Sequence, residues 1–135
     1  MDLNDYDIPI DVIHHVILKH ISYFELDNIL PYFRLTPKEI AIIKFKIYIK
    51  KLKITKYYDR TEYKIEGKLH REGDLPAIEY ADGDKYWYIN GKLNREDDLP
   101  AIEYADGDKY WYINEQLHRE DELLAYKMMV LENVE

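Results

Sequence analysis

An internal repeat of 24 residues constrains the fold of this chain more than any other feature of its sequence. Residues 67–90 and residues 91–114 are identical at 22 of 24 positions. A third copy begins at residue 115 and soon diverges, and a weaker copy precedes residue 67. A constant period of this length is typical of an array in which each unit buries an apolar face against the next, with divergent copies as caps.

Each repeat has the pattern of a β-hairpin. Residues 77–81 predict a short strand, and residues 85–89 predict the return strand because they are rich in aromatic and other strand-favouring side chains. Asp82-Gly83 between them predicts a two-residue type I′ turn, in which both central residues have positive φ, and Asn90-Gly91 predicts a second turn of this kind. With this register, the predicted core face carries Ile78, Tyr80, Trp87 and Ile89, and the opposite face carries Glu79, Tyr86 and Tyr88.

The repeats resemble the MORN-type repeat family, in its variant form with an H-R-x-x-G-P-A loop. The matching residues are Asn90, Gly91, Lys92, Leu93, Arg95, Pro100, Ala101, Gly107, Tyr110 and Trp111. The chain departs from the pattern at Asp74 and Leu75, where an additional leucine precedes Pro76, and at Asn94, which replaces the loop histidine. The resemblance covers residues 61–125 and implies a curved antiparallel sheet that binds or scaffolds without catalysis. Such repeats are common in large DNA viruses of amoebae, so the resemblance also implies a viral protein.

The N-terminal segment has the periodicity of helices. Apolar residues at spacings of three and four form one stripe, which consists of Val12, Ile13, Val16, Ile17 and Ile21. A short second helix is predicted over residues 24–30. Residues 36–39, Thr-Pro-Lys-Glu, form a capping box that predicts a third helix over residues 37–52. The alternation of apolar residues and lysine within 43–50 favours a strand instead, but the capping box and the length of the run favour the helix.

The pattern of residues 8–30 resembles an F-box, a small helical module that docks on the Skp-type adaptor of cullin-RING ubiquitin ligases. The matching residues are Ile8, Pro9, Val12, Ile13, Ile17, Ile21, Leu26 and Ile29. The residues that would bind the adaptor under this resemblance are Pro9, Val12, Ile13, Ile17 and Leu26. The third helix departs from the family, because no tryptophan ends it. The alternative is a helical cap that closes the sheet, since any three-helix cap has similar apolar stripes.

These patterns predict an α+β fold for the 135 residues. We expect an N-terminal helical segment at residues 1–52, packed on an antiparallel β-meander of 24-residue hairpin repeats at residues 53–135. Residues 122–132 predict either a capping helix or a final strand. Because no run is apolar enough to span a bilayer and no secretion signal opens the chain, we expect a cytoplasmic protein, in the host cell or in the virion if it is viral.

The sequence offers few groups for catalysis or metal binding. It has no cysteine, a single serine at Ser22 and no glycine-rich phosphate loop, so we expect no enzyme activity and no cofactor. His70 and His118 share one repeat position, but Asn94 interrupts the series, which favours a loop imidazole bonded to backbone over a metal ligand. Asp82-Gly83-Asp84 and its copy one period later could ligate calcium, but a hairpin turn with solvated carboxylates is favoured, because the longer ligand series and the bidentate glutamate of an EF-hand are missing.

Charge and aromatic content favour protein partners. Residues 61–135 carry nineteen acids and nine bases, which disfavours nucleic acid. The lysines of residues 37–60 could contact nucleic acid or an anionic membrane, but a solvated face of one element is favoured. The predicted binding surface of the sheet consists of Tyr86, Tyr88, Tyr110, Tyr112, Glu79 and Glu103. Exposed aromatic residues anchor partners at low entropic cost, and this acidic surface would select a basic or apolar protein. Alternatively, these residues only stabilise the sheet through cross-strand pairs.

We therefore expect a non-enzymatic protein–protein interaction module, and two functional hypotheses follow. In the first, an F-box-type adaptor presents the repeat sheet to a second partner. In the second, the chain is a structural or virion scaffold component of a large DNA virus. No nucleic acid or membrane partner is expected, and exposed edge strands favour self-association.

Overall fold

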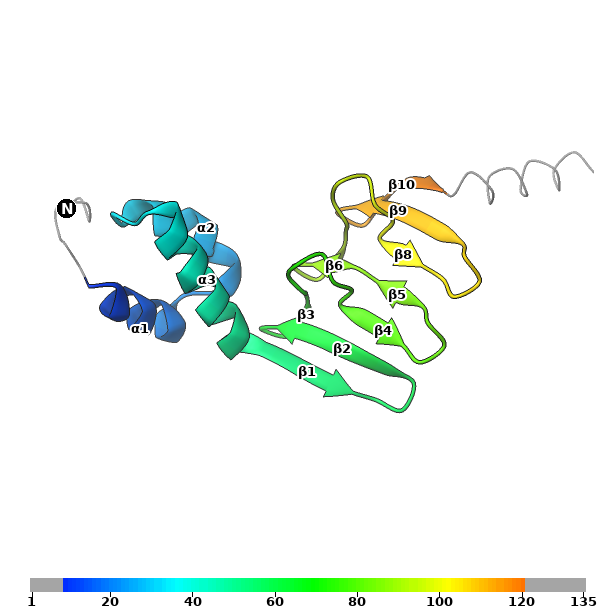
Figure 1. Ribbon diagram of the computed structural model, residues 1–135, viewed down its shortest axis with the longest axis horizontal. Coiled ribbons are helices and arrows are strands. Elements are labelled where there is room, and N and C mark those ends of the chain that lie inside the picture. The colour runs from blue at the N-terminus through cyan, green and yellow to red at the C-terminus, as the bar shows by residue number, and fades with distance from the viewer. Residues whose placement is uncertain (1–8, 121–135) are drawn as a thin grey trace, which may run out of the picture. The chain divides into compact units, whose positions relative to one another are not determined.

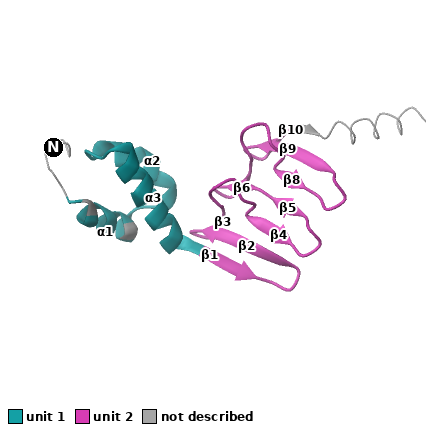
Figure 2. Ribbon diagram, in the orientation of Figure 1, with its two compact units in different colours: residues 1–52 teal, residues 53–135 magenta. Residues whose placement is uncertain are grey.

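The computed structural model describes residues 9–120. Helices come first along the chain and antiparallel strands follow, so the predicted α+β class is confirmed (Figure 1). The chain divides into two compact units, residues 1–52 and residues 53–135, which we call the helical unit and the repeat unit (Figure 2). The predicted tail element at residues 122–132 and Ile8 of the F-box-like pattern lie outside the described residues. Among residues 9–120, no helix is both long enough and apolar enough to cross a membrane.

Within its described residues, 9–52, the helical unit consists of two longer helices and three short helical turns. Its elements are α1 (Ile10–His20), η2 (Tyr23–Glu25), α2 (Leu26–Ile29), η3 (Leu30–Tyr32) and α3 (Pro37–Lys51). The predicted second helix is therefore a series of turns, and it continues past Leu30 because Pro31 occupies the start of η3, where no amide donor is needed. The buried residues of the unit are Ile13, Ile17, Tyr23, Leu26, Leu30, Ile43, Ile47 and Tyr48.

The predicted capping box begins α3. The Thr36 amide donates to the Glu39 carboxylate at 2.7 Å, and the Glu39 amide donates to Thr36 Oγ1 at 3.2 Å. These two bonds satisfy amides that the first turn of a helix leaves without partners. The predicted third helix is confirmed, and the strand favoured by the alternating residues does not form there.

The repeat unit is built of successive antiparallel hairpins. Its strands are β1 (Leu52–Lys56), β2 (Arg60–Ile65), β3 (Lys68–Leu69), β4 (Ile78–Tyr80), β5 (Lys85–Tyr86), β6 (Tyr88–Ile89), β7 (Lys92–Leu93), β8 (Ile102–Glu103), β9 (Lys109–Ile113) and β10 (Gln116–Glu120). Among the described residues, the main sheet has the order β1-β2-β4-β5-β8-β9-β10, β3 pairs with β2, and β6 and β7 form a separate two-stranded sheet. Figure 1 shows the hairpins following one another from green β1 to orange β10.

The turn at Asp82-Gly83 differs from the predicted one. The Tyr80 amide donates to the Asp84 carbonyl at 2.9 Å, and the Gly83 amide donates to the Tyr80 carbonyl at 3.1 Å. Gly83 has a φ of 105°, whereas Asp82 does not have a positive φ. The loop is therefore a three-residue type I turn with a glycine bulge, and the prediction of a two-residue type I′ turn is wrong here.

The additional loop residue shifts the register by one and exchanges the predicted faces. Ile78 lies opposite Tyr86 rather than Trp87, and Tyr86 lies opposite Ile102 of the next repeat. Because side chains alternate along a strand, Tyr86 shares the face of Ile78, and Trp87 shares the face of Glu79. The predicted grouping of Trp87 with Ile78, and of Tyr86 with Glu79, is wrong for this reason.

The second turn has the predicted geometry, and the sequence period is also a structural period. Asn90 and Gly91 have φ values of 51° and 75°, and Asn114-Glu115 one period later has values of 48° and 67°. Trp87 and Trp111 each donate their Nε1–H to the backbone carbonyl 13 residues earlier, at 3.1 and 3.0 Å. Equivalent residues of the two copies thus make equivalent bonds.

Candidate interaction site

Apolar side chains lie on two sides of α3, and only one of these sides is covered. Ile43 and Ile47 are buried in the core of the helical unit. Ile42, Phe45 and Ile49 are spaced three and four residues apart and remain 40%, 63% and 53% exposed. We call these three residues the α3 stripe. A continuous exposed apolar row on a helix is typical of a docking surface, unlike single apolar residues scattered over a surface.

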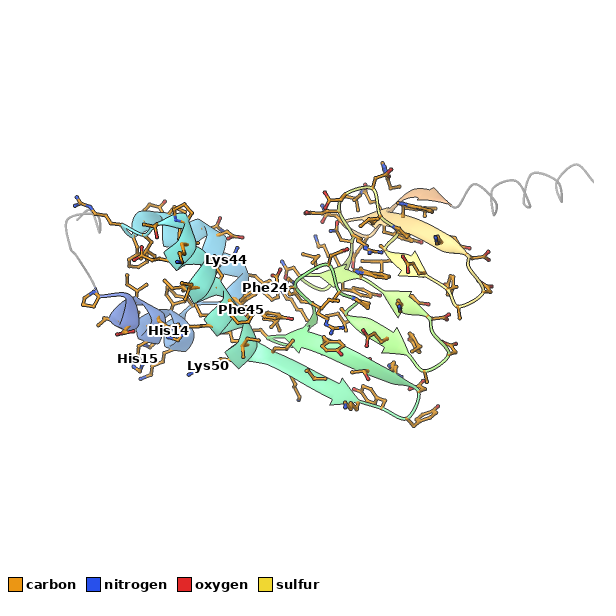
Figure 3. The ribbon with its side chains drawn as sticks, in the orientation of Figure 1. His14, His15, Phe24, Lys44, Phe45 and Lys50 are labelled. Atoms are coloured by element: carbon orange, nitrogen blue, oxygen red, sulfur yellow. The ribbon has the colours of Figure 1, made fainter. Side chains whose placement is uncertain are left out.

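An open hollow lies beside the α3 stripe. It is lined by His14, Phe45, Lys46, Ile49 and Lys50 and has a volume of about 400 Å³. His14 comes from α1 and the other residues come from α3, as the labels of His14, Phe45 and Lys50 in Figure 3 show. An open hollow between two helices of one unit suits a protein segment better than a small molecule, because small molecules bind in pockets that enclose them.

His14 lines the hollow, and one of its ring nitrogens is buried without a hydrogen bond in the described part of the chain. Its Nε2 is buried and has no hydrogen-bond partner among the described residues. Burial lowers the pKa of His14, and the positive charges of Lys46 and Lys50 lower it further, against the opposing effect of Asp11. The imidazole is therefore neutral at neutral pH.

The residues implied by the F-box resemblance fall into two groups. Pro9 and Val12 are exposed. The others are at most 4% exposed and pack in the core of the helical unit, namely Ile13, Ile17 and Leu26. Only Pro9 and Val12 can therefore contact a partner directly, and the three buried residues support the fold.

The α3 stripe was missed by the analysis of sequence motifs. Phe45 and Ile49 belong to the run of residues 43–50, whose apolar–lysine alternation obscures their helical spacing. Plotting residues 37–51 on a helix would have found the stripe, because Ile42, Phe45 and Ile49 fall on one side and Ile43 and Ile47 on another.

The two glutamates predicted to bind a partner are occupied by bonds within the sheet. Glu79 pairs with Arg71 at 2.8 Å, and Glu103 pairs with Arg95 at 3.0 Å. Both glutamates also lie opposite Lys85 in the register of the sheet. This face is therefore a row of alternating charges, and it is not the continuous acidic surface that was predicted.

The tyrosines lie on the opposite face in a continuous row. Ring centroids are 5.6 Å apart for Tyr80 and Tyr86, 6.0 Å for Tyr86 and Tyr104, and 5.8 Å for Tyr104 and Tyr110, all in edge-on arrangements. Burial raises the pKa of Tyr86 and, to a smaller extent, that of Tyr88. These contacts are those of cross-strand stabilisation.

The two remaining predicted tyrosines occupy equivalent positions in successive hairpins. Tyr88 lies opposite Leu93 in β6–β7, and Tyr112 lies opposite Leu117 in β9–β10. All four tyrosines of the predicted surface are half-buried. Each of these four tyrosines is therefore less exposed than Phe45 of the α3 stripe, which is 63% exposed.

Polar groups of the repeat loops bond to the backbone. The Asp82 carboxylate accepts from the Asp84 amide at 3.0 Å, and the Asp84 carboxylate accepts from the Ala105 amide at 2.7 Å. His70 Nδ1 accepts from the Asn90 amide at 2.9 Å, as predicted for a loop imidazole bonded to backbone. Within residues 9–120, no group of three or more histidine, aspartate or glutamate side chains is placed to hold a metal ion.

Comparisons with protein families, with curated proteins and with solved structures found no match to the chain. The function is therefore inferred from the geometry of the α3 stripe, together with the two sequence resemblances.

Proposed function

We propose that the protein is a non-enzymatic protein–protein interaction module whose helical unit docks on a partner through the α3 stripe. The observation that carries this proposal is the exposure of Ile42, Phe45 and Ile49 in one row beside the hollow. Burying a side chain of the size of Phe45 is worth roughly 1.5–3 kcal/mol, so a partner that covers the row gains binding free energy.

The F-box-like pattern of residues 8–30 makes a Skp-type adaptor of a ubiquitin ligase the first partner to test. In this arrangement the helical unit binds the adaptor, and the repeat unit recruits a second protein for modification. The exposed positions of Pro9 and Val12 at the start of α1 are compatible with such docking. The protein would then act in the host cytoplasm.

The test is a calorimetric titration of the full chain with a Skp-type adaptor. We expect micromolar binding by the wild type and at least about tenfold weaker binding by the Phe45→Asp/Ile49→Asp variant, which loses two apolar contacts. Tyr32→Asp is the matched control, because Tyr32 is an aromatic residue of the same unit and is 59% exposed. Absence of wild-type binding removes the adaptor as partner, and binding that the double variant leaves unchanged removes the α3 stripe as the site.

The repeat unit supports a second candidate function, a scaffold component of a large DNA virus. The row of tyrosines continues from one repeat to the next, and β1 at the edge of the sheet can accept a further strand. A virion component should be abundant in proteomes of purified particles, whereas an adaptor should be scarce there. Light scattering over a range of concentrations tests the self-association that a scaffold requires.

A further inference from the structure

The charges around the α3 stripe indicate the chemistry of its partner. Lys46 and Lys50 line the hollow one helical turn apart, and neither forms an ion pair among the described residues. Lys44 of the same helix, by contrast, is paired with Asp27 at 2.6 Å. The hollow therefore combines exposed apolar side chains with two positive charges that form no ion pair within residues 9–120.

From this combination we propose that the α3 stripe binds an acidic amphipathic segment of a partner protein. The inference rests on the proposed function, because it describes the partner of the same site. The apolar face of the segment covers the stripe, and its carboxylates lie near Lys46 and Lys50.

A nucleic acid would also be attracted by two lysines, but it fits the site less well. Phosphate contacts satisfy the positive charges and leave Phe45 and Ile49 exposed to water. The formal net charge of −8 on the chain also opposes the approach of a polyanion. A short acidic segment meets less repulsion and buries the apolar row at the same time.

The experiment uses the full chain and two synthetic amphipathic peptides of about 16 residues, long enough to form a helix. The peptides share one apolar face and carry either glutamate or lysine along its border. Fluorescence anisotropy should show that the glutamate peptide binds at least about tenfold more tightly than the lysine peptide. The glutamate peptide is attracted by Lys46 and Lys50, whereas the lysine peptide is repelled by both. A fluorescent single-stranded DNA is the third probe, and we expect it to bind more weakly than the glutamate peptide.

Two charge-reversal variants test whether the preference arises at the hollow. Lys46→Glu/Lys50→Glu should abolish or invert the preference between the peptides. Lys38→Glu/Lys53→Glu is the matched control, because it changes the net charge equally at exposed positions that do not line the hollow. The control should keep the preference of the wild type, apart from a small long-range effect that salt screens.

The outcomes separate this inference from the proposed function. If both peptides bind equally and Phe45→Asp/Ile49→Asp weakens both, the acidic partner is wrong while the α3 stripe remains a docking site. If that double variant leaves peptide binding unchanged, the stripe is not the site and both proposals fail. The proposal of an acidic segment is wrong if the glutamate peptide does not bind. It is also wrong if the DNA binds more tightly than the glutamate peptide and the Lys46→Glu/Lys50→Glu variant loses that DNA binding.

Discussion

His70 and Asn94 show how a repeat position changes identity and keeps its contact. The Asn90 amide donates to His70 Nδ1 at 2.9 Å, and one period later the Asn114 amide donates to Asn94 Oδ1 at 3.1 Å. His70 and Asn94 are both buried, at 4% and 7% exposure, so the acceptor atom of each side chain needs a donor inside the protein. The substitution that interrupts the histidine series in the sequence therefore preserves its structural role.

His70→Asn should consequently be tolerated better than His70→Ala. Alanine leaves the Asn90 amide without an acceptor and lowers the free energy of unfolding by about 1–3 kcal/mol, whereas asparagine should cost less than about 1 kcal/mol. Urea denaturation followed by tryptophan fluorescence measures this in the repeat unit, because Trp87 and Trp111 are the two tryptophans of the chain. Equal losses in the two variants would contradict the acceptor role.

Glu62 makes the stability of the repeat unit depend on pH. Its carboxylate accepts from Arg60 Nε at 2.8 Å and pairs with Lys64 at 2.9 Å, and these bonds lower its pKa below the usual value of 4.5. Since the pKa is lower in the folded state, the stabilisation is complete above about pH 4.5 and is lost as the pH falls through the lowered pKa.

Glu62→Gln keeps the shape of the side chain and removes its charge. The variant should be less stable than the wild type at neutral pH and should lose less stability on acidification. Urea midpoints measured at a series of pH values from neutral to acid would show two curves that converge at low pH. Parallel curves would mean that Glu62 does not contribute to the acid sensitivity.

At the scale of elements, α3 shows which part of the fold was predictable. The capping box is local chemistry between Thr36 and Glu39, and it correctly predicted a helix against the alternating pattern. The sequence marks Phe45 and Ile49 as apolar but does not show which side of α3 the neighbouring elements cover. The stripe depends on tertiary packing, so a motif analysis could predict the helix and not the site.

The hairpins were predictable in the same limited sense. Asp82-Gly83 and Asn90-Gly91 are both turn dipeptides, but only the second forms the type I′ turn. The carboxylate of Asp82 holds the Asp84 amide at 3.0 Å, and the carboxylate of Asp84 holds the amide of Ala105 in the next repeat at 2.7 Å. The sequence of the dipeptide does not reveal these contacts. The position of the turn was therefore predicted correctly, but the strand register and the residues on each face of the sheet were not.

The type I′ turns also predict a stabilising substitution. Glu115 has a φ of 67° and occupies the position that Gly91 holds in the preceding repeat, at 75°. A side chain with a Cβ is strained in this region, so Glu115→Gly should raise the stability of the repeat unit by about 0.5–1 kcal/mol after the entropic cost of glycine. Thermal unfolding should show a higher Tm.

The reciprocal variant is the control for this turn. Gly91→Ala places a Cβ in the same strained conformation, 3.5 Å from the side chain of Lys68, and should lower the Tm. If Glu115→Gly lowers the Tm as well, the glutamate makes a contribution in the native state that outweighs the backbone strain.

In the molecule as a whole, repeats are joined by side chains as well as by strands. Arg95 donates from Nε and Nη2 to the carboxylate of Asp74 in the preceding repeat, at 2.8 and 3.1 Å. Its guanidinium lies 3.8 Å from the ring centroid of Trp87, which also belongs to that repeat, and Nη1 donates to Glu103 in its own repeat at 3.0 Å. One side chain therefore links the stability of two neighbouring repeats.

Arg71 makes a similar set of contacts, with one difference. It pairs with Glu79 at 2.8 Å and lies 3.7 Å from the ring centroid of Tyr63. The position 24 residues before Asp74 is occupied by Lys50 and not by an acidic residue. The ion pair that joins Arg95 to the preceding repeat therefore has no counterpart at Arg71, and the array should be coupled more strongly between its two near-identical copies.

A double-mutant cycle with Arg95→Ala and Asp74→Ala measures this coupling. Because Asp74 is 55% exposed, we expect a coupling energy of only about 1 kcal/mol, decreasing at high salt. Arg71→Ala with Asp98→Ala is the matched cycle, since no ion pair joins these two residues, and its coupling should stay below about 0.5 kcal/mol. If the first cycle also shows no coupling at low salt, strand pairing and apolar packing alone transmit stability along the array, and the guanidinium serves only its own repeat.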